Sequence, residues 1–195
     1  TFIGFGIALV AAGAAAAQAA LAAGVLVLVG SVFDLFDGAL ARATGRVSKL
    51  GAFYDSVFDR WGEGVVYVGI AWGCAAAWFW EGAVLAAAAL ATAVIVSYTR
   101  AKSEGLGFMS GSRMASVGLA PREVRIIVLS VGLIAMGVMG GVQMVCDTGF
   151  GGCPSLLERR DGSIFLAIGV ALIAFLATIT AIQRILHVRA QAREG

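Results

Sequence analysis

The sequence predicts an all-α integral membrane protein with six transmembrane helices and a polar cavity on the cytoplasmic side. Of its 195 residues, 60% are hydrophobic and only 13% are charged, and the mean hydropathy is +0.93. This composition lies far from that of soluble proteins. Apolar segments recur at the length of about 20 residues that a membrane-spanning helix requires. Carboxylates between residues 34 and 59 fall within or beside these segments, which places a polar site among them.

We expect residues 1–195 to form a single domain. The chain shows no removable signal peptide, and it opens without an initiator Met directly on an apolar run. The N-terminus is therefore expected to be truncated, with a further segment, such as an interfacial helix, before Thr1 in the natural chain. The 27 glycines suit helices that pack closely in lipid, where small residues let backbones approach.

The first three predicted spans lie in the N-terminal part of the chain. Residues 2–17 are apolar and form the first helix, which ends in an uncharged turn near 15–20. A second run at about 21–43 is long enough to cross the membrane, and a short polar link at 45–50 follows it. Residues 51–79 form the third span, with acidic residues in its first turns and tryptophans at its exit, as in an interfacial aromatic belt.

Longer polar loops separate the other three spans. The fourth span covers about 83–103, and a glycine-rich loop at 105–120 follows it. The fifth helix is predicted to begin at Pro121, because proline at the first helical position loses only a donor that has no partner there, and to run to about 145. A second loop at 146–162 leads to the sixth span, 163–187, and a short basic tail.

The distribution of positive charge orients these spans. Of the 14 Lys and Arg residues, only Arg159 and Arg160 lie outside the side that holds the link at 45–50, the loop at 105–120 and the C-terminus. Cytoplasmic flanks collect Lys and Arg, so that side is predicted to be cytoplasmic. We therefore expect a multi-pass plasma-membrane protein with both termini in the cytoplasm. A net charge of only +2 argues against nucleic acid as a partner.

The cysteines follow from this orientation. Cys146 and Cys153 fall in the non-cytoplasmic loop, where conditions can be oxidising, and both a local disulfide and two free thiols fit their spacing. Cys74, within the third span, is predicted to be a small packing residue. No Cys/His spacing indicates a zinc site.

Four aspartates indicate the chemistry. Asp34 and Asp37 are three residues apart, and Asp55 and Asp59 are four apart, so each pair shares one helix face. A charge at the bilayer centre costs about 2.5–3.5 kcal/mol, so such residues face a polar interior, a partner or an ion. Carboxylate oxygens select Mg²⁺, Mn²⁺ or Ca²⁺. Four of them can hold two divalent ions, an arrangement that stabilises phosphoryl displacement, or can leave one acid as a base.

The residues beside the aspartates suit a diphosphate ligand. Gly38 and Gly51 leave room for a bulky polar ligand to approach the backbone. Arg42 adds a planar donor group. The whole stretch has the pattern Asp34-x2-Asp37-Gly38-x2-Ala41-Arg42-x8-Gly51-x3-Asp55-x3-Asp59.

This pattern resembles the complete signature of the CDP-alcohol phosphotransferases, with all eight fixed positions present. Members of that family are six-helix membrane enzymes that transfer a phosphatidyl-type group from a CDP-linked lipid to an alcohol, release CMP and act as homodimers. The resemblance implies that the predicted cavity is an active site with Mg²⁺ or Mn²⁺, and we expect two ions because they would balance the charge of the carboxylates. It also implies a CDP-diacylglycerol or CDP-archaeol donor, contact with membrane lipids and a homodimer.

The resemblance also implies roles by position. Asp59 would be the general base that takes the proton from the acceptor hydroxyl. The metal ligands would be Asp34, Asp37 and Asp55, with Asp59 as a further ligand. The CDP-lipid would be bound by Asp34, Asp37, Gly38, Ala41, Arg42, Ser48, Gly51 and Asp55.

Two further segments, 97–107 and 118–125, resemble the branch of the family that uses inositol phosphate, so inositol 1-phosphate is the expected acceptor. Glycerol 3-phosphate, serine and inositol are the alternatives. Arg122 and Arg125, three residues apart, could clamp one phosphate or could simply anchor a helix end at the membrane. The full set of candidate ligands for the acceptor phosphate is Arg100, Arg113, Arg122, Arg125 and Arg184.

Some residues and one rival function stay open at this point. Glu63 could support the metal site or pair with Arg60 or another cytoplasmic-side neighbour. His187 is expected to be interfacial, without a catalytic part. A cation transporter would also use intramembrane acids, but its acids should be distributed through the membrane depth, whereas these cluster near one face.

Overall fold

The computed structural model describes residues 2–43, 48–108, 118–141 and 162–194, apart from the side chains of 37, 38, 41, 42 and 194. Every regular element in these ranges is an α-helix, which confirms the predicted all-α class. The helices are α1 (Phe2–Ala16), α2 (Ala20–Ala43), α3 (Lys49–Ala76), α4 (Trp80–Gly105), α6 (Arg122–Val138) and α7 (Gly162–Glu194).

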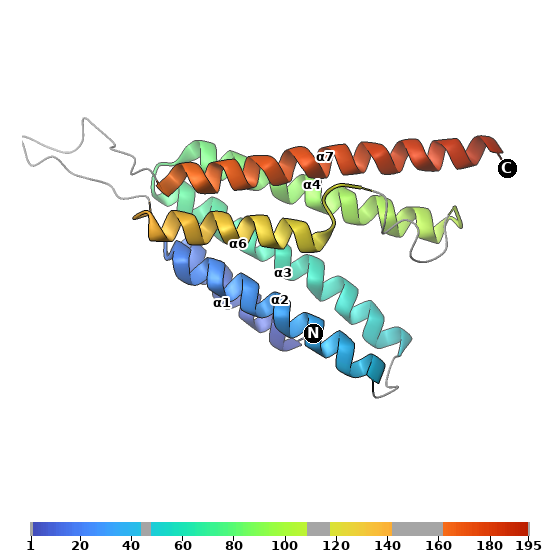
Figure 1. Ribbon diagram of the computed structural model, residues 1–195, viewed down its shortest axis with the longest axis horizontal. Helices are drawn as coiled ribbons and strands as arrows, with labels where there is room; N and C mark the ends of the chain where they lie inside the picture. The colour runs from blue at the N-terminus through green and yellow to red at the C-terminus, as the bar shows by residue number, and fades with distance from the viewer. Residues whose placement is uncertain (1, 44–47, 109–117, 142–161, 195) are drawn as a thin grey trace, which may run out of the picture.

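The helices pack as a closed ring of neighbours. Contacts run from α1 to α2, then to α6, α7, α4 and α3, and α3 returns to α1. In Figure 1, α6 lies between α7 and the α1–α2 pair. Helix α6 packs on α2, and its arginines also reach Asp59 and Glu63 of α3.

Small residues allow this close packing. Ala11, Ala23, Ala86 and Ala89 are completely buried. A Cβ on Gly69 of α3 would overlap the backbone of Ala12 in α1, so these two helices touch through their main chains. Many large apolar side chains are instead exposed on the outside of the bundle. An apolar exterior around a small-residue interior is typical of helices that face lipid.

Two helices are long and apolar enough, by length and composition, to cross a membrane: Trp80–Gly105 and Gly162–Arg193. The apolar segments Phe2–Ala16 and Ala20–Phe36 are shorter. The described residues thus support two candidate membrane-spanning helices, whereas the six predicted spans stay a prediction.

Several predicted boundaries were wrong. The fifth predicted helix ends at Val138 instead of about 145, because Gly140 and Gly141 adopt φ values of 97° and 67°, which glycine tolerates and which do not continue a helix. Pro121 is the N-cap of that helix, not its first helical residue. The basic tail after residue 187 is helical, as part of α7.

Other sequence predictions have clear outcomes. Cys74 is buried, as expected of a packing residue. Trp78 and Trp80 lie exposed at the turn between α3 and α4, with ring centroids 6.3 Å apart, and their place in an interfacial aromatic belt stays a prediction. Cys146 and Cys153 lie outside the described residues, so the disulfide stays a prediction.

The segment before α6 is fixed to α7 by one hydroxyl. The backbone N–H groups of Leu119 and Ala120 each donate to Oγ1 of Thr180, at 3.0 Å. The Arg125 side chain donates to the carbonyl of Ala120 at 2.9 Å. These bonds satisfy buried backbone groups and set the position of the first turn of α6, where Arg122 lies.

Candidate active site

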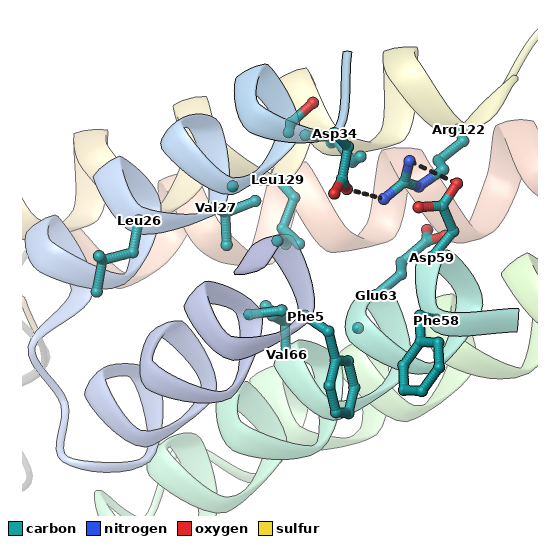
Figure 2. A pocket seen from close by; sticks show the side chains of 16 residues that line it. Phe5, Leu26, Val27, Asp34, Phe58, Asp59, Glu63, Val66, Arg122 and Leu129 are labelled. Carbon is teal, nitrogen blue, oxygen red and sulfur yellow. Dashed lines mark hydrogen bonds and ion pairs between the residues drawn. The ribbon is translucent and has the colours of Figure 1, made fainter. Parts of the chain in front are cut away.

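Three helices bring Asp34, Asp59 and Arg122 together at one point. The Arg122 guanidinium, from α6, contacts Oδ2 of Asp34 on α2 at 3.0 Å and Oδ2 of Asp59 on α3 at 2.9 Å. Figure 2 shows the guanidinium between the two carboxylates, with a dashed line to each. The two carboxylate side chains are each 16% exposed and the arginine is 25% exposed, so solvent screens these ion pairs only in part.

These groups form the polar end of a small, partly open cavity between α1, α2, α3 and α6. Its other end is apolar, with Leu26, Val66 and Leu129 among the residues that line it. Figure 2 shows Phe5 and Phe58 on the side opposite Asp34. A cavity that is charged at one end and apolar at the other has the mixed lining that suits an amphiphilic ligand.

Gly4 of α1 is a site residue that the sequence analysis missed. A Cβ at this position would overlap the carboxylate of Asp34. Gly4 therefore leaves the space in which that carboxylate reaches Arg122. An uncharged glycine in an apolar helix gives no chemical signal, and only its contact with Asp34 reveals its importance.

We expect Gly4→Ala to reduce the catalytic rate by at least about tenfold, because a misplaced reactive group of this kind costs on the order of 10–100-fold. The added methyl group displaces the Asp34 carboxylate from Arg122. The measurement is initial rate with purified enzyme in detergent. Gly6→Ala is the matched control, because a Cβ at Gly6 meets nothing within 4 Å. Equal rates for Gly4→Ala and Gly6→Ala would contradict the assigned contact.

The remaining motif positions are placed only in part. Asp55 lies one helical turn before Asp59 on α3. Residues 37, 38, 41 and 42 belong to α2, but their side chains lie outside the description. Ser48 is the N-cap of α3, and its Oγ accepts a hydrogen bond from the Gly51 N–H at 3.0 Å. This cap gives Ser48 and Gly51 a role in starting the helix that carries Asp55 and Asp59.

A second ion pair lies deeper in the bundle. Arg125 donates from Nε and Nη2 to the two carboxylate oxygens of Glu63, at 2.7 and 2.8 Å. The arginine side chain is 2% exposed and the glutamate 6%. This pair ties α3 to α6 one turn beyond the contact between Asp59 and Arg122. It resolves the open alternative for Glu63 in favour of pairing, with Arg125 and not with Arg60, which donates to Ser56.

The candidate acceptor arginines do not share one set of partners. Arg122 contacts Asp34 and Asp59, whereas Arg125 is bound to Glu63. Arg100 pairs with Glu104 on the same helix at 2.9 Å, and Arg184 is buried and donates to the carbonyl of Val96 at 2.6 Å. Arg113 lies outside the described residues. Because Arg122 and Arg125 pair with different carboxylates here, a clamp of both on one phosphate stays a prediction.

The donors in the cavity fit a divalent cation. Asp34 and Asp59 direct carboxylate oxygens at a single cationic group from two different helices. Oxygen donors of this kind suit Mg²⁺ and Mn²⁺. Among the described side chains, no three Asp, Glu, His or Cys residues gather as metal ligands. The predicted metal site of four aspartates includes Asp37, whose side chain lies outside the description, so this site stays a prediction.

Comparison with known proteins identifies the chain's family. The sequence profile of the CDP-alcohol phosphatidyltransferases matches residues 1–188. The chain belongs to this family. The predicted resemblance is thus confirmed, and the family it identifies is one of phosphatidyltransferases, not of ion transporters.

Several curated relatives of this CDP-alcohol phosphatidyltransferase are named archaetidylinositol phosphate synthase or phosphatidylinositol phosphate synthase. The archaetidylinositol phosphate synthase of Pyrococcus horikoshii is 37% identical over 145 residues, which cover 74% of this chain and 72% of that protein. The phosphatidylinositol phosphate synthase of Streptomyces avermitilis is 32% identical over 179 residues, or 88% of this chain and 63% of that protein. The match spans only 34% of a bifunctional IPC transferase and DIPP synthase of Rubrobacter xylanophilus.

Solved structures show the same fold. The phosphatidylinositol phosphate synthase of Mycobacterium tuberculosis, solved with CDP-DAG bound, superposes with a TM-score of 0.74 at 24% identity, over 96% of this chain and 83% of that chain. A second structure of that protein, with manganese and citrate, gives the same TM-score and covers 79% of that chain. The helical arrangement of this CDP-alcohol phosphatidyltransferase is therefore the arrangement of those enzymes.

Proposed function

We propose that this CDP-alcohol phosphatidyltransferase transfers a phosphatidyl or archaetidyl group from a CDP-linked lipid to inositol 1-phosphate and releases CMP. The observation that carries the proposal is the convergence of Asp34 and Asp59, the first and last acids of the family motif, on one amphiphilic cavity. The names of the relatives from Pyrococcus horikoshii and Streptomyces avermitilis support inositol phosphate as the acceptor.

Asp59 is the proposed general base. Its carboxylate lines the cavity on α3, where it can take the proton from the acceptor hydroxyl. The hydroxyl oxygen then forms a bond to the phosphorus that bears the lipid, while the bond from that phosphorus to the CMP phosphate oxygen breaks. A bound Mg²⁺ or Mn²⁺ pair would neutralise the charge that develops on the phosphates. Asp34, with Asp37 and Asp55, would hold the metal and the CDP diphosphate.

The cavity's two ends suit the two substrates. The charged end, with Arg122, faces the phosphates, because a guanidinium is a strong donor to a phosphate dianion. The apolar lining near Val66 and Leu129 suits the lipid part of the donor. The donor is CDP-diacylglycerol or CDP-archaeol, because the relatives include both a phosphatidylinositol phosphate synthase and an archaetidylinositol phosphate synthase.

The surrounding architecture belongs to the same proposal. Six helices cross the plasma membrane, with both termini and the active site on the cytoplasmic side, as the distribution of Lys and Arg predicts. Residues 1–195 form one phosphatidyltransferase domain, and two copies form a homodimer in contact with membrane lipids. This orientation gives a water-soluble acceptor and a bilayer-held donor access to the same carboxylates.

The test is release of CMP from CDP-diacylglycerol or CDP-archaeol by purified protein in detergent with Mg²⁺ or Mn²⁺. We expect labelled inositol 1-phosphate to be converted to a lipid, at least about tenfold faster than glycerol 3-phosphate, serine or inositol, since a site that binds the correct polar groups discriminates by at least this factor. Equal rates with glycerol 3-phosphate would remove the acceptor assignment and leave the reaction class. If no alcohol releases CMP from either donor, the reaction class fails.

A further inference from the structure

Arg122 lies between two carboxylates, those of Asp34, a metal ligand in the proposed function, and of Asp59, the proposed base. One guanidinium contacts Oδ2 of Asp34 and Oδ2 of Asp59 at 3.0 and 2.9 Å. Its Nε is buried and has no hydrogen-bond partner. Without Arg122, two partly buried carboxylates would face each other with less compensation for their charge.

We propose that Arg122 is an internal counter-ion that competes with the divalent metal for Asp34 and Asp59, and so sets the affinity of the site for metal. The inference rests on the proposed function, in which Asp34 binds metal, and on Asp59 as the further metal ligand that the family motif implies. A carboxylate oxygen bound to a guanidinium has fewer lone pairs to offer a metal, and the added positive charge repels a second cation. Metal binding to Asp34 and Asp59 therefore requires that the guanidinium leave their oxygens.

The placement of Arg122 supports a side chain that can leave. It is the first residue of α6, after the N-cap Pro121, and it is 25% exposed. Arg125, one turn later, is 2% exposed and is held by both oxygens of Glu63 and by the Ala120 carbonyl. Backbone bonds from Leu119 and Ala120 to Thr180 fix the same turn. The helix end is therefore anchored without Arg122, and only its side chain needs to move.

The competition predicts that removal of the Arg122 side chain increases the affinity of the site for metal. A side chain that merely supports the site would weaken metal binding when it is removed. Removal of a competing cation instead strengthens metal binding, and it destabilises the metal-free protein because two carboxylates lose their partner. The two effects together distinguish a counter-ion from a supporting residue.

The experiment measures Mn²⁺ binding by the electron paramagnetic resonance signal of free Mn²⁺, with full-length protein in detergent and without CDP-lipid. We expect Arg122→Gln to bind Mn²⁺ about tenfold more tightly than the unmodified chain, a change of about 1.4 kcal/mol. We also expect its melting temperature without metal to fall and its increase on addition of Mn²⁺ to be larger. Unchanged or weaker Mn²⁺ binding by Arg122→Gln overturns the proposal.

Three further variants make the result specific. Arg189→Gln removes the same charge from an exposed position near the C-terminal end of α7 and should leave Mn²⁺ affinity unchanged. Arg122→Lys keeps the charge but cannot bridge two carboxylates in the same way, so it should bind Mn²⁺ with intermediate affinity, and it serves if Arg122→Gln does not fold. Asp34→Asn should weaken Mn²⁺ binding. If Asp34→Asn has no effect, the metal site of the proposed function fails, whereas an effect of Asp34→Asn without one of Arg122→Gln rejects only the competition.

Discussion

Glu63→Gln is expected to destabilise the protein by about 3–5 kcal/mol, because loss of one partner leaves the other buried charge uncompensated. The Arg125 guanidinium is 2% exposed and donates hydrogen bonds to both carboxylate oxygens of Glu63. A glutamine offers one oxygen and no charge. The measurement is thermal unfolding in detergent, monitored as the fraction of protein that stays monodisperse at each temperature. We expect a marked fall in melting temperature.

Glu104→Gln is the control for this effect. It also removes a carboxylate that pairs with an arginine, but the side chains of Arg100 and Glu104 are 39% and 35% exposed. Exposed pairs contribute about 0–1 kcal/mol, so this variant should melt close to the unmodified chain. The double variant Glu63→Leu with Arg125→Met should recover much of the stability, because apolar replacement of a buried pair is often neutral. If Glu63→Gln and Glu104→Gln have equal melting temperatures, the buried pair does not stabilise the bundle as inferred.

Asp59→Asn is expected to lower the rate of CMP release by about 10²–10⁴-fold, the contribution of a positioned general base. The asparagine side chain has nearly the same shape and can still accept a hydrogen bond from Arg122, so the variant should fold. The amide cannot take the acceptor's proton. The measurement is the initial rate at saturating CDP-lipid and acceptor, together with the melting temperature.

Glu123→Gln provides the matched comparison for Asp59→Asn. Glu123 is an exposed acid beside Arg122 on the first turn of α6, and it does not line the cavity. Its replacement should change the rate by less than about twofold, the range of a small electrostatic effect near a helix terminus. An Asp59→Asn variant that retains the full rate of CMP release would reject Asp59 as the base.

The sequence was sufficient for the helices because their signals are local. Hydropathy over about 20 residues indicated each apolar segment, and Pro121 marked the start of a helix to within one residue. The errors occurred where local signals were ambiguous. The run up to residue 145 is apolar enough to continue a helix, but Gly140 and Gly141 end it early through their positive φ values. The basic residues after 187 were predicted to form a tail beyond the last helix, but they belong to α7.

The motif spacing also predicted part of the site. Helical periodicity placed Asp55 and Asp59 on one face of α3, and the pattern from Asp34 to Asp59 indicated that α2 and α3 act together. The spacing could not reveal which cation lies between Asp34 and Asp59. That partner, Arg122, lies 63 residues beyond Asp59 in the sequence, where local patterns predict only a ligand of the acceptor phosphate or an anchor of the helix end.

What the sequence determined by itself was the class of protein, the extent of most helices and the chemistry of the motif, because each depends on residues within about 30 positions of one another. Only the tertiary structure decided the partners. Glu63 had three open alternatives, and the packing of α6 on α3 selected Arg125. Gly4 carries no chemical signal, and the packing of α1 on α2 gave it a place beside Asp34. Long-range partners depend on how the helices close into a ring, and local patterns along the chain do not specify that closure.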